Sequence, residues 1–134
     1  MHRVAPIAVV LLAVAAAASA DGAVEPTGFA FGRVGGNIRP FLVTIANTGV
    51  VHTSGAVSVR RTKVTSVQLA TLNRVATETS FELMPKATNC SGTLPDVAST
   101  YVRVGARTVR VHGNCVPRYT RMWKAPSAAV RVSS

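Results

Sequence analysis

Carboxylate and histidine side chains, which carry out most acid–base catalysis, are few in this chain of 134 residues and stand apart. Glu78 and Glu82 have the spacing of neighbours on a helix, but the helix expected there ends between them. We therefore do not expect these two carboxylates to act as a catalytic pair. His52 and His112 each fall on a predicted strand without a carboxylate nearby, which gives little basis for a zinc site. We therefore predict no catalytic residues, no metal site and no cofactor.

Two further patterns that could mark an active site are incomplete. The chain has many serines, but none stands in the nucleophile-elbow sequence of serine hydrolases. Residues 32–36 resemble a phosphate-binding loop only in their glycine content, because they precede a strand and do not open a helix. The sequence favours a binding protein over an enzyme.

Cys90 and Cys115 are the two cysteines of the chain. In an exported domain, which residues 1–20 indicate, two cysteines most simply form one disulfide. A reactive thiol would need surroundings that lower its pKa, and a metal site would need further ligands close by. We predict a structural disulfide that closes a loop of about 25 residues.

The first twenty residues have the layout of a secretion signal. A short basic start is followed by an apolar run at residues 7–18, and Ala18-Ser19-Ala20 fits the small-residue pattern that signal peptidase cleaves. The run is shorter than the roughly 20 residues of a membrane-spanning helix. We expect cleavage after Ala20, a secreted or extracytoplasmic product without a transmembrane segment, and a flexible leader at residues 21–27.

The chain is strongly basic, with a net charge of +10 that falls to +9 when Arg3 leaves with the signal. Such a charge favours an anionic partner: an acidic protein, a cell-surface polymer, a lipid headgroup or a nucleic acid. The basic residues are dispersed along the sequence, a distribution that is also typical of an ordinary solvated surface.

Strands are predicted where side chains alternate between two faces or where β-branched residues are frequent. These segments are residues 28–34, 41–45, 50–53 and 56–60, and a later hairpin at residues 99–104 and 107–112. Turns follow from Asn47-Thr48-Gly49 and from Gly105-Ala106. Residues 81–84 are expected to be extended, and residues 86–95 to form a loop rich in Asn, Ser, Gly and Pro.

Two helices are predicted. The first, at residues 64–79, begins with a capping box of Thr65 and Gln68 and carries an apolar stripe at helical spacing. The second begins at Pro117 and ends at Pro126, and residues 126–134 are expected to be a flexible tail.

Together these elements predict an α+β fold: one domain at residues 28–125, with an antiparallel sheet of about four to five strands and two helices on one face. The predicted core combines residues from both helices and four strands: Phe41, Val43, Ile45, Leu69, Leu72, Val75, Ala76, Val102, Val104, Val109, Val111, Met122 and Trp123.

The run Arg33-Val34-Gly35-Gly36 lies at the first turn of the predicted sheet. It is followed by the hairpin at residues 45–51, the helix at residues 64–76, the strands at residues 101–111 and the final helix. In this order and in the arginine-x-Gly-Gly run, the chain resembles the emfourin family of small bacterial proteins over roughly residues 28–125. The resemblance implies a related fold and, because emfourin inhibits thermolysin-like metalloproteases, a protease-inhibitor function.

The sequence therefore predicts a secreted, non-catalytic binding module whose contact element is the glycine-rich loop. Its binding residues would be Arg33, Gly35, Gly36, Asn37 and Arg39. The alternative is a cationic protein that binds the cell envelope or another anionic polymer through its dispersed basic residues.

Overall fold

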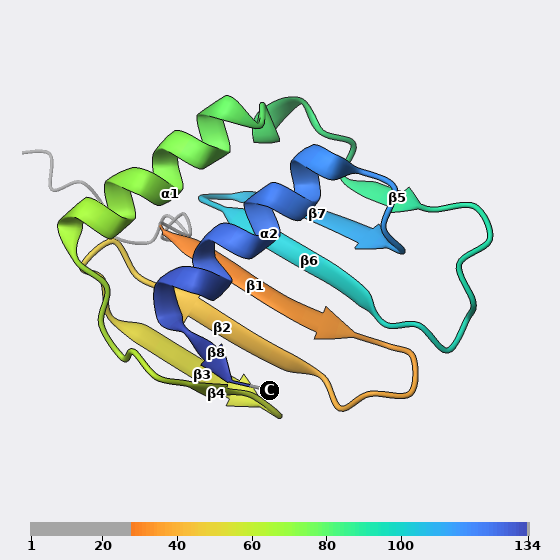
Figure 1. Ribbon diagram of the computed structural model, residues 1–134, viewed down its shortest axis with the longest axis horizontal. Coiled ribbons are helices and arrows are strands. Elements are labelled where there is room, and N and C mark those ends of the chain that lie inside the picture. The colour runs from red at the N-terminus through yellow and green to blue at the C-terminus, as the bar shows by residue number, and fades with distance from the viewer. Residues whose placement is uncertain (1–27, 134) are drawn as a thin grey trace, which may run out of the picture.

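The computed structural model describes residues 28–133 (Figure 1), so the expected signal peptide and leader, residues 1–27, lie outside the described residues. Eleven elements follow one another along the chain: β1 (Phe29–Val34), β2 (Phe41–Ile45), β3 (Val51–Gly55), β4 (Ser58–Val59), α1 (Ser66–Glu78), the 3₁₀ helix η1 (Phe81–Leu83), β5 (Ala87–Asn89), β6 (Ser99–Val104), β7 (Arg107–His112), α2 (Pro117–Val130) and β8 (Val132–Ser133).

The fold is α+β, with one six-stranded sheet in the order β3-β2-β1-β6-β7-β5 and a small second sheet of β4 and β8. Neighbouring strands of the large sheet are antiparallel except β5, which pairs in parallel with β7. The predicted α+β fold with two helices and one disulfide is confirmed, but the predicted antiparallel sheet of about four to five strands is a mixed sheet of six. Residues 87–89 were assigned to a loop because turn-forming residues surround them, and only pairing with β7 makes them a strand.

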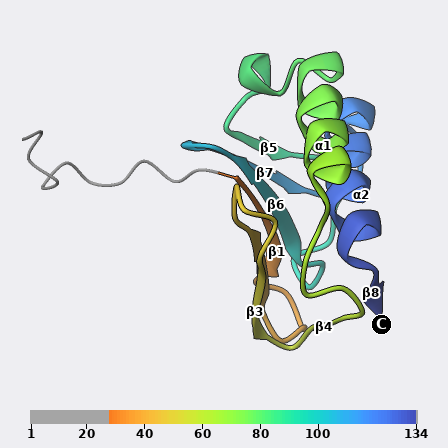
Figure 2. The same cartoon turned by 90° about the vertical axis from the view of Figure 1, so that its left-hand side faces the viewer.

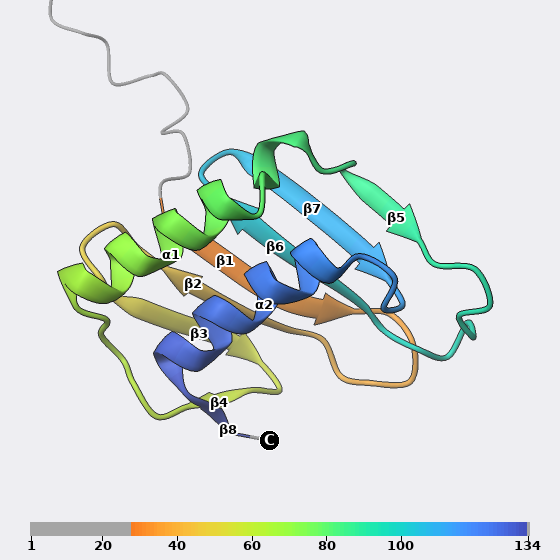
Figure 3. The ribbon, with the colours of Figure 1, turned by 45° about the horizontal axis from the view of Figure 1, so that its top comes forward.

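Both long helices cover the same face of the large sheet (Figure 2). We call this the helix face and the other the open face. Figure 3 shows α2 lying across the middle of the sheet and α1 beside it. Within residues 28–133, no helix covers the open face.

The start of α1 follows from its capping residues. The Thr65 hydroxyl accepts a hydrogen bond of 3.1 Å from the Gln68 backbone amide, and the Gln68 side chain accepts one of 2.8 Å from the Thr65 amide. These bonds satisfy two donors that a helix start leaves unpaired. The predicted capping box is confirmed. The segment after α1 was predicted to be extended, but residues 81–83 form η1.

The last helix begins at Pro117, as predicted, but does not end at Pro126. Proline has no amide hydrogen and removes one helical bond, so a helix stop was expected there. The helix continues because Pro126 and Val130 are both buried against the core. It ends at Arg131, and the next residues form β8, which pairs with β4. Residues 126–133 are therefore part of the domain, and the flexible tail expected there was wrong.

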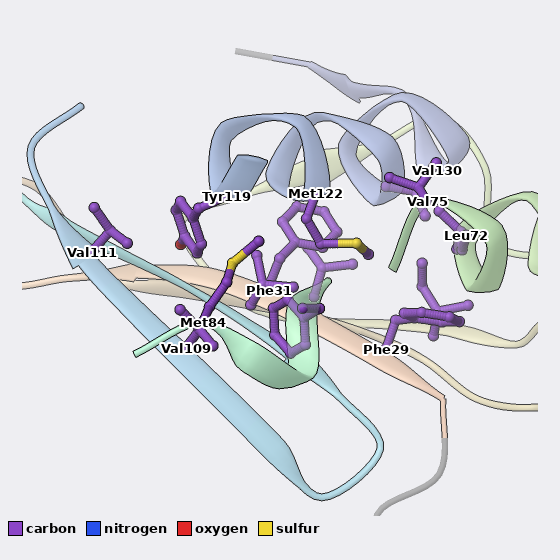
Figure 4. Close-up of a cluster of buried hydrophobic side chains, with 14 of the residues drawn as sticks. Phe29, Phe31, Leu72, Val75, Met84, Val109, Val111, Tyr119, Met122 and Val130 are labelled. Carbon is purple, nitrogen blue, oxygen red and sulfur yellow. The ribbon is translucent and has the colours of Figure 1, made fainter. Parts of the chain in front are cut away.

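The core lies between the helix face and the two helices (Figure 4). Of the predicted core, the residues that are fully buried are Val43, Ile45, Leu72, Val75, Val102, Val109, Val111 and Met122. The others pack against them and are half-buried. The predicted core left out further residues that are buried: Phe29, Phe31, Phe81, Met84, Tyr119 and Val130.

Candidate functional site

Of the predicted contact loop, Arg33 to Arg39, the structure places Arg33 and Val34 at the end of β1, and residues 35–40 join β1 to β2 at one end of the large sheet (Figure 1). Gly35, Gly36, Asn37 and Arg39 are all exposed to solvent there. Gly35 has a φ of 73°, and no atom lies within 4 Å of the place where its Cβ would be. The backbone at Gly35 is thus open to a partner on this side.

A second loop, residues 91–98 between β5 and β6, lies against the first. The Asn37 amide donates a hydrogen bond of 3.1 Å to the carbonyl of Asp96. Gly36 packs so closely that a Cβ would lie 2.5 Å from the Asp96 carbonyl oxygen and 2.7 Å from the Ala98 amide nitrogen. Glycine is needed at position 36 both for its φ of 62° and for this close approach.

The disulfide anchors the second loop at its start. Cys90 and Cys115 are bonded, with their Cα atoms 5.7 Å apart, which confirms the predicted pairing. The bond ties the end of β5 to the turn before α2. At the other end of the loop, Val97 has its carbonyl oxygen 2.9 Å from Nε2 of His112. The loop is held at both ends, and we call residues 35–40 and 91–98 together the loop surface.

Three large apolar side chains are exposed on the loop surface: Ile38 at 41%, Leu94 at 63% and Val97 at 44% of their area. They are three of the six large hydrophobic residues that are exposed among the described residues. Exposed apolar side chains on neighbouring loops are a feature that protein interfaces also show. Leu94 and Val97 were not predicted as contact residues, although two apolar residues in a loop of turn-forming residues next to a predicted disulfide were a detectable signal.

The predicted site residue Arg33 lies apart from this surface, on the helix face. Its guanidinium carbon is 6.0 Å from the centre of the Phe41 ring and 5.8 Å from that of Trp123. Phe31 meets the Trp123 ring edge-on, with the ring centres 5.4 Å apart. Cation–π contacts of this kind stabilise packing. The structure thus places Gly35, Gly36, Asn37 and Arg39 on one exposed loop. Arg33 instead lies against the aromatic rings of Phe41 and Trp123.

Positive charge is spread widely over the described part. Of the 15 Lys and Arg residues, all but Arg3 lie in residues 28–133, whereas three of the five acidic residues do. Glu78 on α1 pairs with Arg74 at 3.6 Å and also with Arg121 of α2. Arg118 and Lys124, also on the exposed side of α2, have no carboxylate partner among the described residues.

Histidine and tyrosine side chains often act in catalysis. In the described part, His112 and Tyr119 form hydrogen bonds within the fold. His112 holds Asn89 through a 2.8 Å contact between Nδ1 and Oδ1, and His52 is exposed on β3. Burial raises the pKa of Tyr119 to about 12, although a 2.8 Å hydrogen bond with the Thr100 hydroxyl acts in the opposite direction. Within residues 28–133, no three His, Cys, Asp or Glu side chains gather in a way that could hold a metal ion.

Comparison with protein-family models, with curated proteins and with solved structures finds no match for this chain. The relationship to the emfourin family therefore stays a prediction. Among the helices of the described part, none combines the length and the apolar character needed to cross a membrane.

Proposed function

We propose that this protein is an exported, non-catalytic module that binds another protein through the loop surface. The observation that carries the proposal is that two loops that hydrogen-bond to each other carry three exposed apolar side chains, Ile38, Leu94 and Val97. An apolar centre surrounded by polar residues is the usual composition of a protein interface. Arg39, exposed beside Ile38, would attract an acidic partner and orient it.

The fixed geometry of the loops supports this function. A flexible loop loses conformational freedom when it binds, and that loss lowers affinity. Here the disulfide, the Asn37–Asp96 bond and the His112 contact with Val97 hold both loops before any partner arrives. A loop surface held in this way is suited to tight binding.

For the partner, we propose an extracellular protease of the thermolysin-like metalloprotease class. This part of the proposal comes from the resemblance of the Arg33-Val34-Gly35-Gly36 turn to the emfourin family. The open backbone at Gly35 supports it, because a glycine turn lets a protease cleft approach closely and form main-chain hydrogen bonds there.

A second candidate function is the binding of an anionic cell-envelope polymer. The observation in its favour is the exposed side of α2, where Arg118, Arg121 and Lys124 follow one another at helical spacing. Such a surface would bind many polyanions with little selectivity.

Salt dependence separates the two functions. The protein lacking its signal is titrated with a panel of secreted metalloproteases and with an anionic polymer such as heparin, each at low and at high salt. Binding through the loop surface should keep most of its affinity at high salt, whereas polymer binding should weaken steeply. If no protease is bound and only the salt-sensitive polymer interaction is seen, the second candidate replaces the first.

A further inference from the structure

A depression of about 540 Å³ lies beside the loop surface, at the end of the sheet where β1 meets β6 and β7 ends. Gly35, Gly36 and Val97 of the loop surface form part of its wall. Its volume is within the range of pockets that bind small groups. The depression is thus continuous with the surface proposed to bind a protein.

The other lining residues come from the open face of the sheet. Side chains alternate between the two faces along each strand, and Val109 and Val111 are buried on the helix face. Arg110 and His112 therefore point to the open face. Ser99 pairs with His112 in the register of β6 and β7 and lies on the same face.

Hydrogen-bond donors converge in this depression. Arg110 donates a bond of 3.3 Å from Nη2 to the Ser99 hydroxyl oxygen, and this is its one side-chain bond among the described residues. A guanidinium group has five N–H donors, so most of those of Arg110 remain available. The Ser99 hydroxyl is buried, and within the described residues its own hydrogen has no acceptor.

Carboxylates are few around the depression: the exposed Asp96 stands between the lining residues Pro95 and Val97 but does not itself line it. The residues that line the depression include Arg110 and His112 but no Asp or Glu. Both ion pairs found among residues 28–133 involve Glu78, on the helices and not on the open face. A cation with free donors, next to a buried hydroxyl and in a depression that no carboxylate lines, is chemically suited to bind an anion.

We propose that the depression receives the carboxylate of an Asp or Glu side chain of the protein partner, an inference that rests on the proposed function. Arg110 binds the carboxylate oxygens, and the Ser99 hydroxyl donates a further hydrogen bond. His112 is a positioning residue: its ring lies between Asn89 Oδ1 at 2.8 Å and the Val97 carbonyl at 2.9 Å and fixes the loop wall. The apolar loop surface next to the depression favours an acidic side chain on a protein over a free anion.

The site is tested with small probes before a partner is known. N-acetyl-aspartate amide, N-acetyl-asparagine amide and inorganic phosphate are titrated into the wild-type protein, and backbone amide chemical shifts are followed by NMR. The aspartate probe should shift the amides of Gly35, Ser99 and Arg110 in a saturable way, and the asparagine probe should not. Binding of phosphate at this site more tightly than the aspartate probe would overturn the carboxylate assignment.

Two variants complete the test. Arg110→Gln removes the charge in the depression, and Arg118→Gln removes a charge that is also exposed, on α2. Arg110→Gln should weaken the aspartate probe by at least about tenfold, and Arg118→Gln should leave it unchanged. Equal binding to both variants would overturn the inference.

The proposed protein-binding function and the carboxylate site can fail independently of each other. If a protease partner loses affinity with Ile38→Glu but not with Arg110→Gln, the loop surface stands and the carboxylate site is overturned. If the aspartate probe binds as predicted but no protease responds to Ile38→Glu, the proposed function fails and the carboxylate site remains.

Discussion

The Asn37 backbone amide of the β1–β2 loop donates a hydrogen bond of 3.1 Å to the Asp96 carbonyl of the β5–β6 loop. This bond joins two loops that are distant in the sequence into one surface. Gly36 allows it, because any side chain there would collide with the backbone of residues 96–98. The conformation of the β1–β2 loop therefore depends on a second loop that is close in space but far away in the sequence.

Two glycine substitutions test this dependence. Gly35 and Gly36 both have positive φ, so alanine should cost each variant about 1–2 kcal/mol. Gly36→Ala should cost a further 1–3 kcal/mol or so, because its Cβ would lie 2.5 Å from the Asp96 carbonyl oxygen, whereas Gly35→Ala meets open space. Urea unfolding of both variants measures the difference. Equal losses of stability would show that the contact between the loops is unimportant.

Arg33 should contribute to stability, and Arg39 should contribute to association with a partner. Arg33→Ala should lower stability by about 0.5–1 kcal/mol, because it removes the guanidinium from the rings of Phe41 and Trp123. Arg39→Ala should leave stability within about 0.5 kcal/mol of wild type and slow association with an acidic partner. Thermal unfolding and stopped-flow binding of the two variants give the two readouts. A stability loss with Arg39→Ala alone would reverse the assignment.

The disulfide should stabilise the domain by about 3–4 kcal/mol, since it closes a loop of 25 residues. Replacing both Cys90 and Cys115 by serine should lower the urea midpoint by a corresponding amount. Adding reductant to this variant should change nothing further, and this serves as the control. A midpoint equal to that of the oxidised wild type would contradict the prediction.

Alkaline pH should destabilise the protein through Tyr119. Burial raises the pKa of this phenol from 10.0 to about 12 in the folded state, so its neutral form is favoured on folding. The resulting stability is fully present below pH 10 and is lost as the pH rises through about 12. Phenolate absorbance against pH should show a phase near pH 12, and Tyr119→Phe should remove it. A single phase near pH 10 in wild type would contradict this.

Local signals in the sequence predicted the elements that depend on neighbouring residues. The Thr65–Gln68 capping box fixed the start of α1, and Pro117 fixed the start of α2. The end of α2 could not be predicted, because burial of Pro126 and Val130 against distant strands outweighs the helix-breaking effect of proline. Strand β5 was missed for a similar reason: its three residues are a strand only because β7 lies beside them.

The candidate site was predicted in part. Gly35, Gly36, Asn37 and Arg39 could be found from their place in a turn, but the turn rule alone does not show that Gly36 packs against another loop. Leu94, Val97 and Arg110 join the site through sheet pairing and the disulfide, which bring together segments that no local pattern connects.

Binding of a protein partner through the loop surface can be tested directly. The most direct measurement is the dissociation constant of a thermolysin-like metalloprotease for wild type, for Ile38→Glu/Leu94→Glu and for Arg118→Gln/Lys124→Gln. We predict that the loop variant loses at least about a hundredfold in affinity, because two charges would be buried in the interface, and that the α2 variant stays within a few fold of wild type. Unchanged affinity of the loop variant, together with a large loss in the α2 variant, would contradict the account.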